Sequence, residues 1–201
     1  MQKPNGYDEA PVTGSWEAPD VGGHYLIIKK VEERQSKNGK DMIAIMFDFA
    51  GNDKQPGLFM RMFEEDIRPD KKWPYAGSQY VMVNDYNDPS KTSKSFKTFV
   101  TAVEKSNHGF VTSWGDNWGA QFKNKIIGGI FGMVENEYNG NRSMRAQLRW
   151  FCSADAVANA KVPDPKMLTG GSASVAPTNA DMMHEGFMQI PDSVNDEAIP
   201  F

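Results

Sequence analysis

Residues 24–50 have the sequence HYLIIKKVEERQSKNGKDMIAIMFDFA, in which two apolar runs flank a short polar segment. The first run, residues 24–34, is rich in β-branched residues and predicts a strand. The polar segment contains Asn38-Gly39, which is the strongest short signal for a β-hairpin because both residues tolerate a positive φ. The second run, residues 41–50, alternates as a return strand should. Its apolar face carries Ile43, Ile45, Phe47 and Phe49.

The segment that follows the hairpin continues the alternation. Residues 57–64 have the sequence GLFMRMFE, and a period of two predicts a third strand with Phe59, Arg61 and Phe63 on one face. Residues 66–77 predict a loop, and residues 79–84 predict a strand that pairs with the third or continues it. The region therefore predicts β-structure on both sides of a polar loop.

The period then changes from two to that of a helix. Apolar residues at i, i+3, i+4 and i+7 predict an amphipathic helix over residues 95–106, with Ser93 or Ser95 as its N-cap. Residues 125–137 predict a strand that is bent at its glycines. The pair Asn139-Gly140 predicts a second hairpin turn. The last strand, residues 143–152, is expected to point Met144, Ala146, Leu148, Trp150 and Cys152 inward and Arg145, Gln147 and Arg149 outward.

The order of these elements predicts a mainly β fold. A helix between the third and fourth strands is the order of a five-stranded OB-type barrel. The two Asn-Gly turns then fall in the loops that frame the binding face of such domains. Another small α+β barrel or a sandwich remains the alternative.

The charge of the chain is distributed unevenly. The net charge is −4, but residues 1–20 carry −3 and residues 151–201 carry −5, so residues 21–150 carry +4. A basic middle between acidic ends favours a polyanionic partner for the middle. Ordinary scatter of surface charge is the alternative interpretation.

Composition divides the chain into four parts. Residues 1–22, rich in Pro, Gly and Asp, predict a flexible leader, and residues 23–158 predict the folded domain. Residues 159–195 have little apolar bulk and predict a disordered linker, because burial there cannot offset the entropy of ordering. Residues 196–201 form an acidic tip that is expected to bind partner proteins.

The tip ends in an aromatic residue that also carries the chain's free carboxylate. A pocket with an apolar floor and a cation at its lip would capture both groups of Phe201. Proline limits the conformational freedom that docking removes, and the acidic residues attract a basic partner surface. A terminus without function is the alternative. The predicted partner-binding residues are Asp196, Glu197, Ile199, Pro200 and Phe201.

The tip resembles the end of bacterial single-stranded DNA-binding proteins, in which an acidic run precedes Ile-Pro-Phe or Leu-Pro-Phe. Ala198 stands where a third acidic residue is usual. Gly23-His24-Tyr25 followed by residues 36–42 resembles the first hairpin of phage and prophage single-stranded DNA-binding proteins. This second resemblance covers roughly residues 20–50, and the order of elements extends it to about residue 152. It implies an OB domain, sequence-tolerant binding of single-stranded DNA, and a role in viral replication or recombination. The tip is expected to recruit DNA replication, recombination and repair proteins.

Binding a single strand requires cations for phosphates and aromatic faces for bases. Several segments of the predicted domain combine the two kinds of side chain. Core packing is the alternative for Phe59 and Phe63, and Trp114 and Trp118 either stack on bases or form a loop lid over the core. The predicted DNA-binding residues are Lys37, Lys40, Phe59, Arg61, Phe63, Lys71, Lys72, Trp73, Tyr75, Arg142, Arg145 and Arg149.

Catalytic machinery is not expected. The three histidines are scattered, no nucleotide-binding loop or zinc spacing occurs, and neither a cofactor nor a metal is predicted. A metal-dependent nuclease that uses Asp48, Asp66, Asp70, Glu135 and Glu137 is one alternative, and a protein-binding adaptor is another.

The single cysteine, Cys152, excludes an intrachain disulfide and is expected to be an inert buried thiol. Because the sequence shows no signal region and no bilayer-length apolar run, we expect a cytoplasmic protein of viral or bacterial origin. A homo-oligomer is one of the states that we consider for it.

Overall fold

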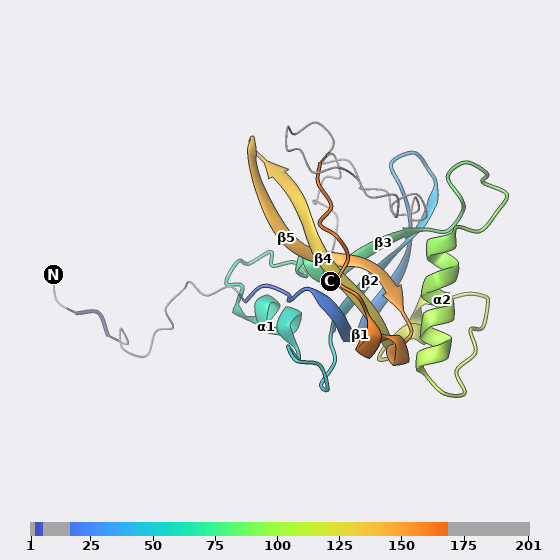
Figure 1. Cartoon of the computed structure of the whole chain (residues 1–201), viewed down its shortest axis with the longest axis horizontal. Coiled ribbons are helices and arrows are strands. Elements are labelled where there is room, and N and C mark those ends of the chain that lie inside the picture. Colours follow the sequence, from blue (N-terminus) through green and yellow to red (C-terminus); the bar gives the residue numbers. More distant parts are fainter. Residues whose placement is uncertain (1–2, 6–16, 169–201) are drawn as a thin grey trace.

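The computed structural model describes residues 3–5 and 17–168, and its main element is a five-stranded antiparallel sheet (Figure 1). The strands are β1 (Gly22–Gln35), β2 (Asp41–Phe49), β3 (Ser78–Met82), β4 (Ile126–Tyr138) and β5 (Asn141–Cys152). The helices are α1 (Leu58–Glu65) and α2 (Lys94–Ser106), with short 3-10 helices η1 (Tyr75–Gly77), η2 (Trp118–Phe122) and η3 (Ala154–Asn159). The prediction of a mainly β fold with a helix between the third and fourth strands is confirmed.

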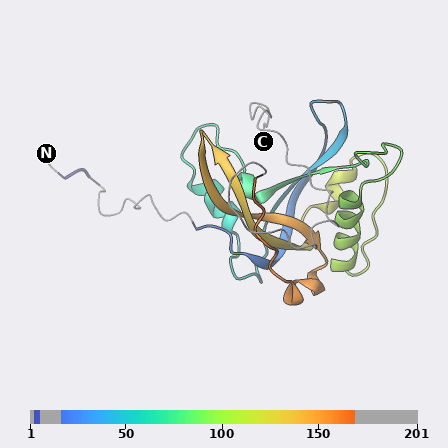
Figure 2. The same cartoon turned by 45° about the horizontal axis from the view of Figure 1, so that its top comes forward.

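The strands lie in the order β3-β2-β1-β4-β5. Strands β4, β1, β2 and β3 thus have the spatial order of a Greek key. The sheet is open, with β3 and β5 as its edges. Helices α1 and α2 lie at opposite ends of one common core, and the β1–β2 and β4–β5 hairpin tips project on the same side of the molecule (Figures 1 and 2).

Both predicted hairpin turns are present. Gly39 has a φ of 69°, and its N–H donates to the carbonyl of Ser36, which closes the turn between β1 and β2. Asn139 and Gly140 have φ values of 50° and 75°, so both central residues of the β4–β5 turn are left-handed. A two-residue turn of this kind matches the twist of the strands that it joins.

The predicted strand over residues 57–64 is wrong, because Leu58–Glu65 forms helix α1. Gly57 starts the helix with a φ of 66°, in the region that glycine adopts without strain. The buried carboxyl of Asp48 then accepts hydrogen bonds from the backbone N–H groups of Phe59 (2.9 Å) and Met60 (3.3 Å). These N–H groups have no partner within a helix, and a carboxyl at that end also favours the helix dipole. A tertiary contact from β2 therefore decides the structure of this segment.

The predicted inward face of β5 is correct for Ala146 and Leu148 but not beyond them. The register between β4 and β5 shifts between Ile130 and Phe131, so that Ile130 pairs with Trp150 and Phe131 with Leu148. The extra residue of this bulge reverses the alternation. Phe151 is therefore buried, whereas Trp150 and Cys152 are half-buried and Met144 is exposed.

Helix α2 is confirmed with its predicted cap. The hydroxyl of Ser93 accepts a hydrogen bond from the backbone N–H of Phe96 at 3.1 Å. The apolar face of the helix joins a core that also contains α1 and η2 residues and the inward residues of the sheet. Its largest fully buried side chains include Phe47, Phe49, Phe59, Phe99, Phe122 and Phe131.

A buried histidine connects the start of β1 to the segment after β2. His24 is enclosed by aromatic rings, and its Nδ1 lies 3.0 Å from the Asp53 carboxyl. Its Nε2 lies 3.0 Å from the carbonyl oxygen of Asp20. The second oxygen of Asp53 accepts the backbone N–H of Tyr25 at 2.8 Å. The sequence predicts residues 17–22 as part of a flexible leader, but the backbone carbonyl of Asp20 in this segment contacts the core histidine.

The chain after η3 runs beside the part of β4 that lies beyond its pairing with β1, which ends at Phe131. The N–H of Lys166 donates to the Met133 carbonyl at 2.9 Å, and the N–H of Glu135 donates to the Lys166 carbonyl at 2.8 Å. The N–H of Leu168 then donates to the Glu135 side chain at 3.0 Å. The first part of the predicted linker, up to Leu168, thus contacts the sheet, and its remainder lies outside the described residues.

Candidate nucleic-acid interface

The loop between α1 and β3 forms a cluster of rings and cations. The indole of Trp73 lies 5.9 Å from the ring of Phe63, and its Nε1 donates to the Gly77 carbonyl at 3.0 Å. The ammonium of Lys71 lies 4.8 Å from the centre of the Phe63 ring, within range of a cation–π contact. Lys72 follows in the same loop. We call these residues and Tyr75 the α1–β3 cluster.

Tyr75 is the most exposed ring of the α1–β3 cluster, with 71 % of its surface accessible. It lies in η1, which contacts β5, and the loop before η1 lies beside the β4–β5 hairpin in both views (Figures 1 and 2). Arg145 on β5 is exposed and makes no ion pair among the described residues. The structure therefore brings the predicted loop residues close to the strand that carries the predicted arginines.

The other two arginines of this hairpin region are already engaged. Arg142 forms ion pairs with Glu137 at 3.0 Å and with Glu135 at 3.7 Å. Arg149 donates to the backbone carbonyl of Asp164 at 3.0 Å. A phosphate that binds either side chain has to share it with these acceptors, so we expect Arg145 to be the most available arginine of β5.

The β1–β2 tip carries a second cation–ring contact. The ammonium of Lys40 lies 4.0 Å from the centre of the Tyr86 ring, and Lys37 is exposed at the same tip. Tyr86 is 61 % exposed, in a loop that is closed by a bridge between Asn84 and Thr92. Tyr86 is not among the residues predicted from the sequence, because it is a lone aromatic residue in a polar loop with no period. We call Lys37, Lys40 and Tyr86 the hairpin-tip cluster.

Phe59 and Arg61 do not share an exposed strand face with Phe63. Phe59 is 0 % exposed and stacks on Phe49 at 5.0 Å, so its ring packs in the core and is not available to a base. The prediction that Phe59 binds DNA is therefore corrected. Arg61 is exposed on α1, where it pairs with Glu17 at 2.8 Å and donates to the Pro56 carbonyl.

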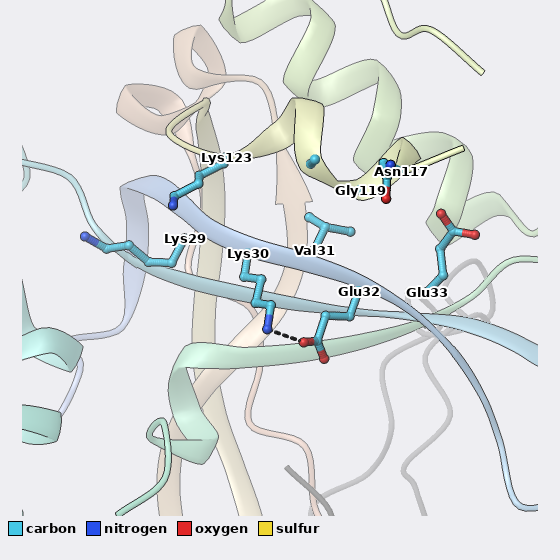
Figure 3. A pocket seen from close by; sticks show the side chains of 9 residues that line it. Lys29, Lys30, Val31, Glu32, Glu33, Asn117, Gly119 and Lys123 are labelled. Carbon is cyan, nitrogen blue, oxygen red and sulfur yellow. Dashed lines mark ion pairs between the residues drawn. The ribbon is translucent and has the colours of Figure 1, made fainter. Parts of the chain in front are cut away.

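A groove of about 610 Å³ lies between β1 and η2 (Figure 3). Gly119 of η2 approaches the carbonyl of Val31 so closely that any side chain at this position would collide with it. Lys29 and Lys123 lie at one end of the groove, and Glu32 and Glu33 lie toward the other (Figure 3). The groove therefore carries both signs of charge and gives no preference for a polyanion.

The carboxylates considered for a nuclease do not form a metal centre. Asp48 is buried at the start of α1, and Asp66 pairs with Arg68 at 2.6 Å at the other end. Hydrogen bonds from Arg68 lower the pKa of Asp66 to about 2. Among the described residues, no group of three or more histidine, cysteine, aspartate or glutamate side chains is arranged to hold a metal ion.

Cys152 is half-buried at the end of β5. Burial raises the pKa of its thiol to about 11, and the charge of Asp155 adds to the shift. Since the thiolate is the reactive form of cysteine, this thiol is poorly nucleophilic at neutral pH.

The predicted partner-binding residues Asp196, Glu197, Ile199, Pro200 and Phe201 lie outside the described residues, so their role stays a prediction. Within residues 3–5 and 17–168, no helix is long and apolar enough to cross a lipid bilayer. No protein-family model matches the chain, and no curated protein matches its sequence. The α1–β3 cluster and the hairpin-tip cluster are therefore the features that point to a function.

Proposed function

We propose that this chain is a non-enzymatic, sequence-tolerant single-stranded DNA-binding protein that protects the strand and recruits replication, recombination and repair proteins through residues 196–201. The α1–β3 cluster is the observation that carries the proposal. It combines an exposed ring, Tyr75, with Lys71 and Lys72, next to the strand that presents Arg145. Bases of a single strand stack on such rings while cations follow the phosphates.

We also propose that the sheet is a partly open OB-type barrel. The Greek-key strand order and the position of α2 between β3 and β4 support this, since OB folds are partly open five-stranded Greek-key barrels. The contact between η1 and β5 supports it further, because η1 leads directly into β3, the opposite edge of the sheet. The two clusters would then lie along the face that such barrels use for oligonucleotides.

Single-stranded DNA is favoured over duplex because the clusters contain rings as well as charges. A duplex keeps its bases stacked on one another, and neutralising its phosphates requires only cations. The rings of Tyr75 and Tyr86 are exposed to water, and this exposure costs free energy. Stacking on bases would offset that cost, because each stacked base contributes about 1–3 kcal/mol.

A titration of the full chain tests this function. Labelled dT oligomers and a duplex of equal length are titrated at two salt concentrations, with Mg²⁺ or with a chelator. We expect salt-sensitive binding to the single strand, weaker binding to the duplex, and no cleavage. Cleavage in Mg²⁺ would favour the nuclease alternative, and the absence of binding to both DNAs would leave the adaptor.

A paired set of variants tests the α1–β3 cluster. Replacing Lys71 and Lys72 by alanine should weaken dT binding and lower the slope of log K against log salt by about 1.4, since each phosphate contact to a single strand contributes about 0.7. The matched control replaces Lys54 and Lys161, which lie outside both clusters, and it removes the same charge. Equal effects of the two pairs would mean that only net charge matters.

Removal of residues 196–201 tests the division of labour. We expect the affinity for dT to stay constant or rise slightly, because an acidic segment competes with DNA for cations. Replication, recombination or repair proteins captured by the full chain should be lost from the shortened one. Loss of DNA binding on truncation would contradict the proposed role of the tip.

A further inference from the structure

The outer face of α2 carries a stripe of lysine and threonine residues. At 100° per residue, Lys94, Thr98, Thr101 and Lys105 lie on one line along the helix. Lys94, Thr98 and Lys105 are exposed, whereas the apolar residues of the opposite side are buried in the core. From the first lysine to the second, the stripe is about 16 Å long, at 1.5 Å per residue. None of the predicted DNA-binding residues lies on this helix.

The cations of this face are largely available. Among the described residues, Lys94, Lys97 and Lys105 form no ion pair, although Lys105 contributes to lowering the pKa of Asp155. The one acidic residue of the helix, Glu104, accepts the backbone N–H of Thr112 at 3.0 Å. The face therefore presents positive charge to solvent, with its carboxylate committed to the neighbouring loop.

That neighbouring loop presents an exposed indole beside the helix. Trp114 is 67 % exposed, and one face of its ring stacks on Trp118 with centroids 5.7 Å apart and planes inclined by 16°. It also lies 6.2 Å from the ring of Phe96 in the first turn of α2. The Gln121 side chain forms two hydrogen bonds of 2.8 Å with the backbone of Ser113, which fixes the loop. The ring is thus held in place, with its other side open to a ligand.

We infer that the outer face of α2 and Trp114 form a second contact surface for single-stranded DNA. Lys94, Lys97 and Lys105 bind phosphates, and Trp114 stacks on a base. This inference rests on the proposed function. It deepens that function, because a long strand contacts both sides of the domain rather than the two clusters alone.

The position of the hairpin-tip cluster supports a continuous path. Tyr86 precedes α2 in the chain, and its loop ends at Ser93, the cap of the helix. The loop that carries the α1–β3 cluster lies at the left of Figure 1, whereas α2 lies at the right. A single strand of DNA that leaves the α1–β3 cluster and passes the β1–β2 tip therefore arrives at the first turn of α2. Charge alone also fits an acidic protein, but a fixed indole beside the lysines favours a nucleic acid.

Two lengths of oligomer test the inference in the full chain. Single OB folds cover about 4–16 nucleotides, so an oligomer of about 8 occupies the primary face and one of about 30 reaches α2. Replacing Lys94 and Lys105 by alanine should leave binding of the short oligomer unchanged. For the long oligomer it should lower the salt slope by about 1.4, at about 0.7 for each phosphate contact. The Lys54 and Lys161 double variant is the matched control, and circular dichroism checks that each variant is folded.

Trp114 provides an independent readout. Replacing it by alanine should weaken binding of the long oligomer only, and replacing it by phenylalanine should restore most of the loss, because phenylalanine retains a stacking face. If the wild-type chain binds neither oligomer, the proposed function itself fails. If the wild type binds both while the Lys94 and Lys105 variant and the Trp114 variant behave like the control, the second surface is wrong. An acidic partner protein would then be the better candidate for α2.

Discussion

Two aspartates at the two ends of α1 differ in burial and in the burial of the groups that they bind. Asp48 lies at the N-terminal end of the helix and is 1 % exposed. Its carboxyl accepts hydrogen bonds from the backbone N–H groups of Phe49, Phe59 and Met60. Asp66 follows the helix, is partly exposed, and accepts hydrogen bonds from Arg68. Asp48 mainly satisfies buried backbone groups, with the Lys29 ammonium at 3.9 Å, whereas Asp66 is bound mainly by the exposed side chain of Arg68.

The comparison shows that burial of its partners determines what a carboxyl contributes. An N–H left without a partner in a dry core costs its full desolvation, about 1–3 kcal/mol. A surface ion pair is in contact with water. When one member is removed, water therefore replaces it as the partner of the other, and little stability is lost. Asp48 therefore stabilises the N-terminal end of α1, the helix that leads into the α1–β3 cluster, whereas Asp66 affects only the loop after α1.

The largest effect is expected at Asp48. Replacing it by alanine leaves the N–H groups of Phe59 and Met60 without an acceptor in the core, and we expect a loss of about 3 kcal/mol of unfolding free energy. Urea unfolding followed by circular dichroism measures this loss. The matched control is Asp66→Ala, which should unfold close to the wild type. Equal midpoints for the two variants would refute the distinction between the two ends.

A smaller effect is expected where the core meets the α1–β3 cluster, at Gly77. A Cβ at this position would lie 2.6 Å from Nε1 of Trp73 and 2.9 Å from the ring of Phe59. Gly77→Ala should therefore cost about 1–3 kcal/mol through overpacking. The displaced indole should also change the near-ultraviolet circular dichroism. An unchanged spectrum would show that Trp73 does not pack as described.

The hairpins and α2 follow from local sequence, whereas α1 does not. Asn139-Gly140 and Ser93 favour a turn and a cap through their own residue types, without help from distant residues. Residues 58–63 are apolar at almost every position, so they fit a period of two and a helix alike, and the choice depends on Asp48, ten residues earlier in the chain. The sequence likewise could not show the bulge that buries Phe151 in place of Trp150, because the extra residue is defined only by pairing with β4.

The candidate site was predictable to a similar extent. The sequence placed Lys71 and Trp73 in one loop because they are close along the chain, but it assigned Phe63 to a separate strand face, and only the structure brings the three together. It placed Phe59 on the same face only through the incorrect strand. Tyr86 was missed because its contact with Lys40 joins two loops that are far apart in sequence.

An effect on binding rather than on folding is expected at Tyr75. Most of its surface is exposed, so Tyr75→Ala should lower the unfolding free energy by less than Asp48→Ala does, and it should weaken dT binding by about 1 kcal/mol or more, the contribution of one stacked base. The matched control is Ile67→Ala in the same loop, since Ile67 is almost fully exposed but has no ring. Fluorescence anisotropy with labelled dT compares the two. Equal affinities would remove Tyr75 from the interface.

The smallest effect is expected from protonation of Asp66. Hydrogen bonds from the side chain and backbone N–H of Arg68 lower its pKa from the usual 3.8 to about 2 in the folded chain. Because the folded-state pKa is the lower one, the pair contributes to stability above about pH 4, and this contribution is lost as the pH falls through 2. A carboxyl chemical-shift titration by NMR should give a midpoint near 2, and Arg68→Ala should return it toward 3.8. A wild-type midpoint already at the usual value would mean that water, rather than Arg68, is the main partner of this carboxyl, and the contrast with Asp48 would then be larger still.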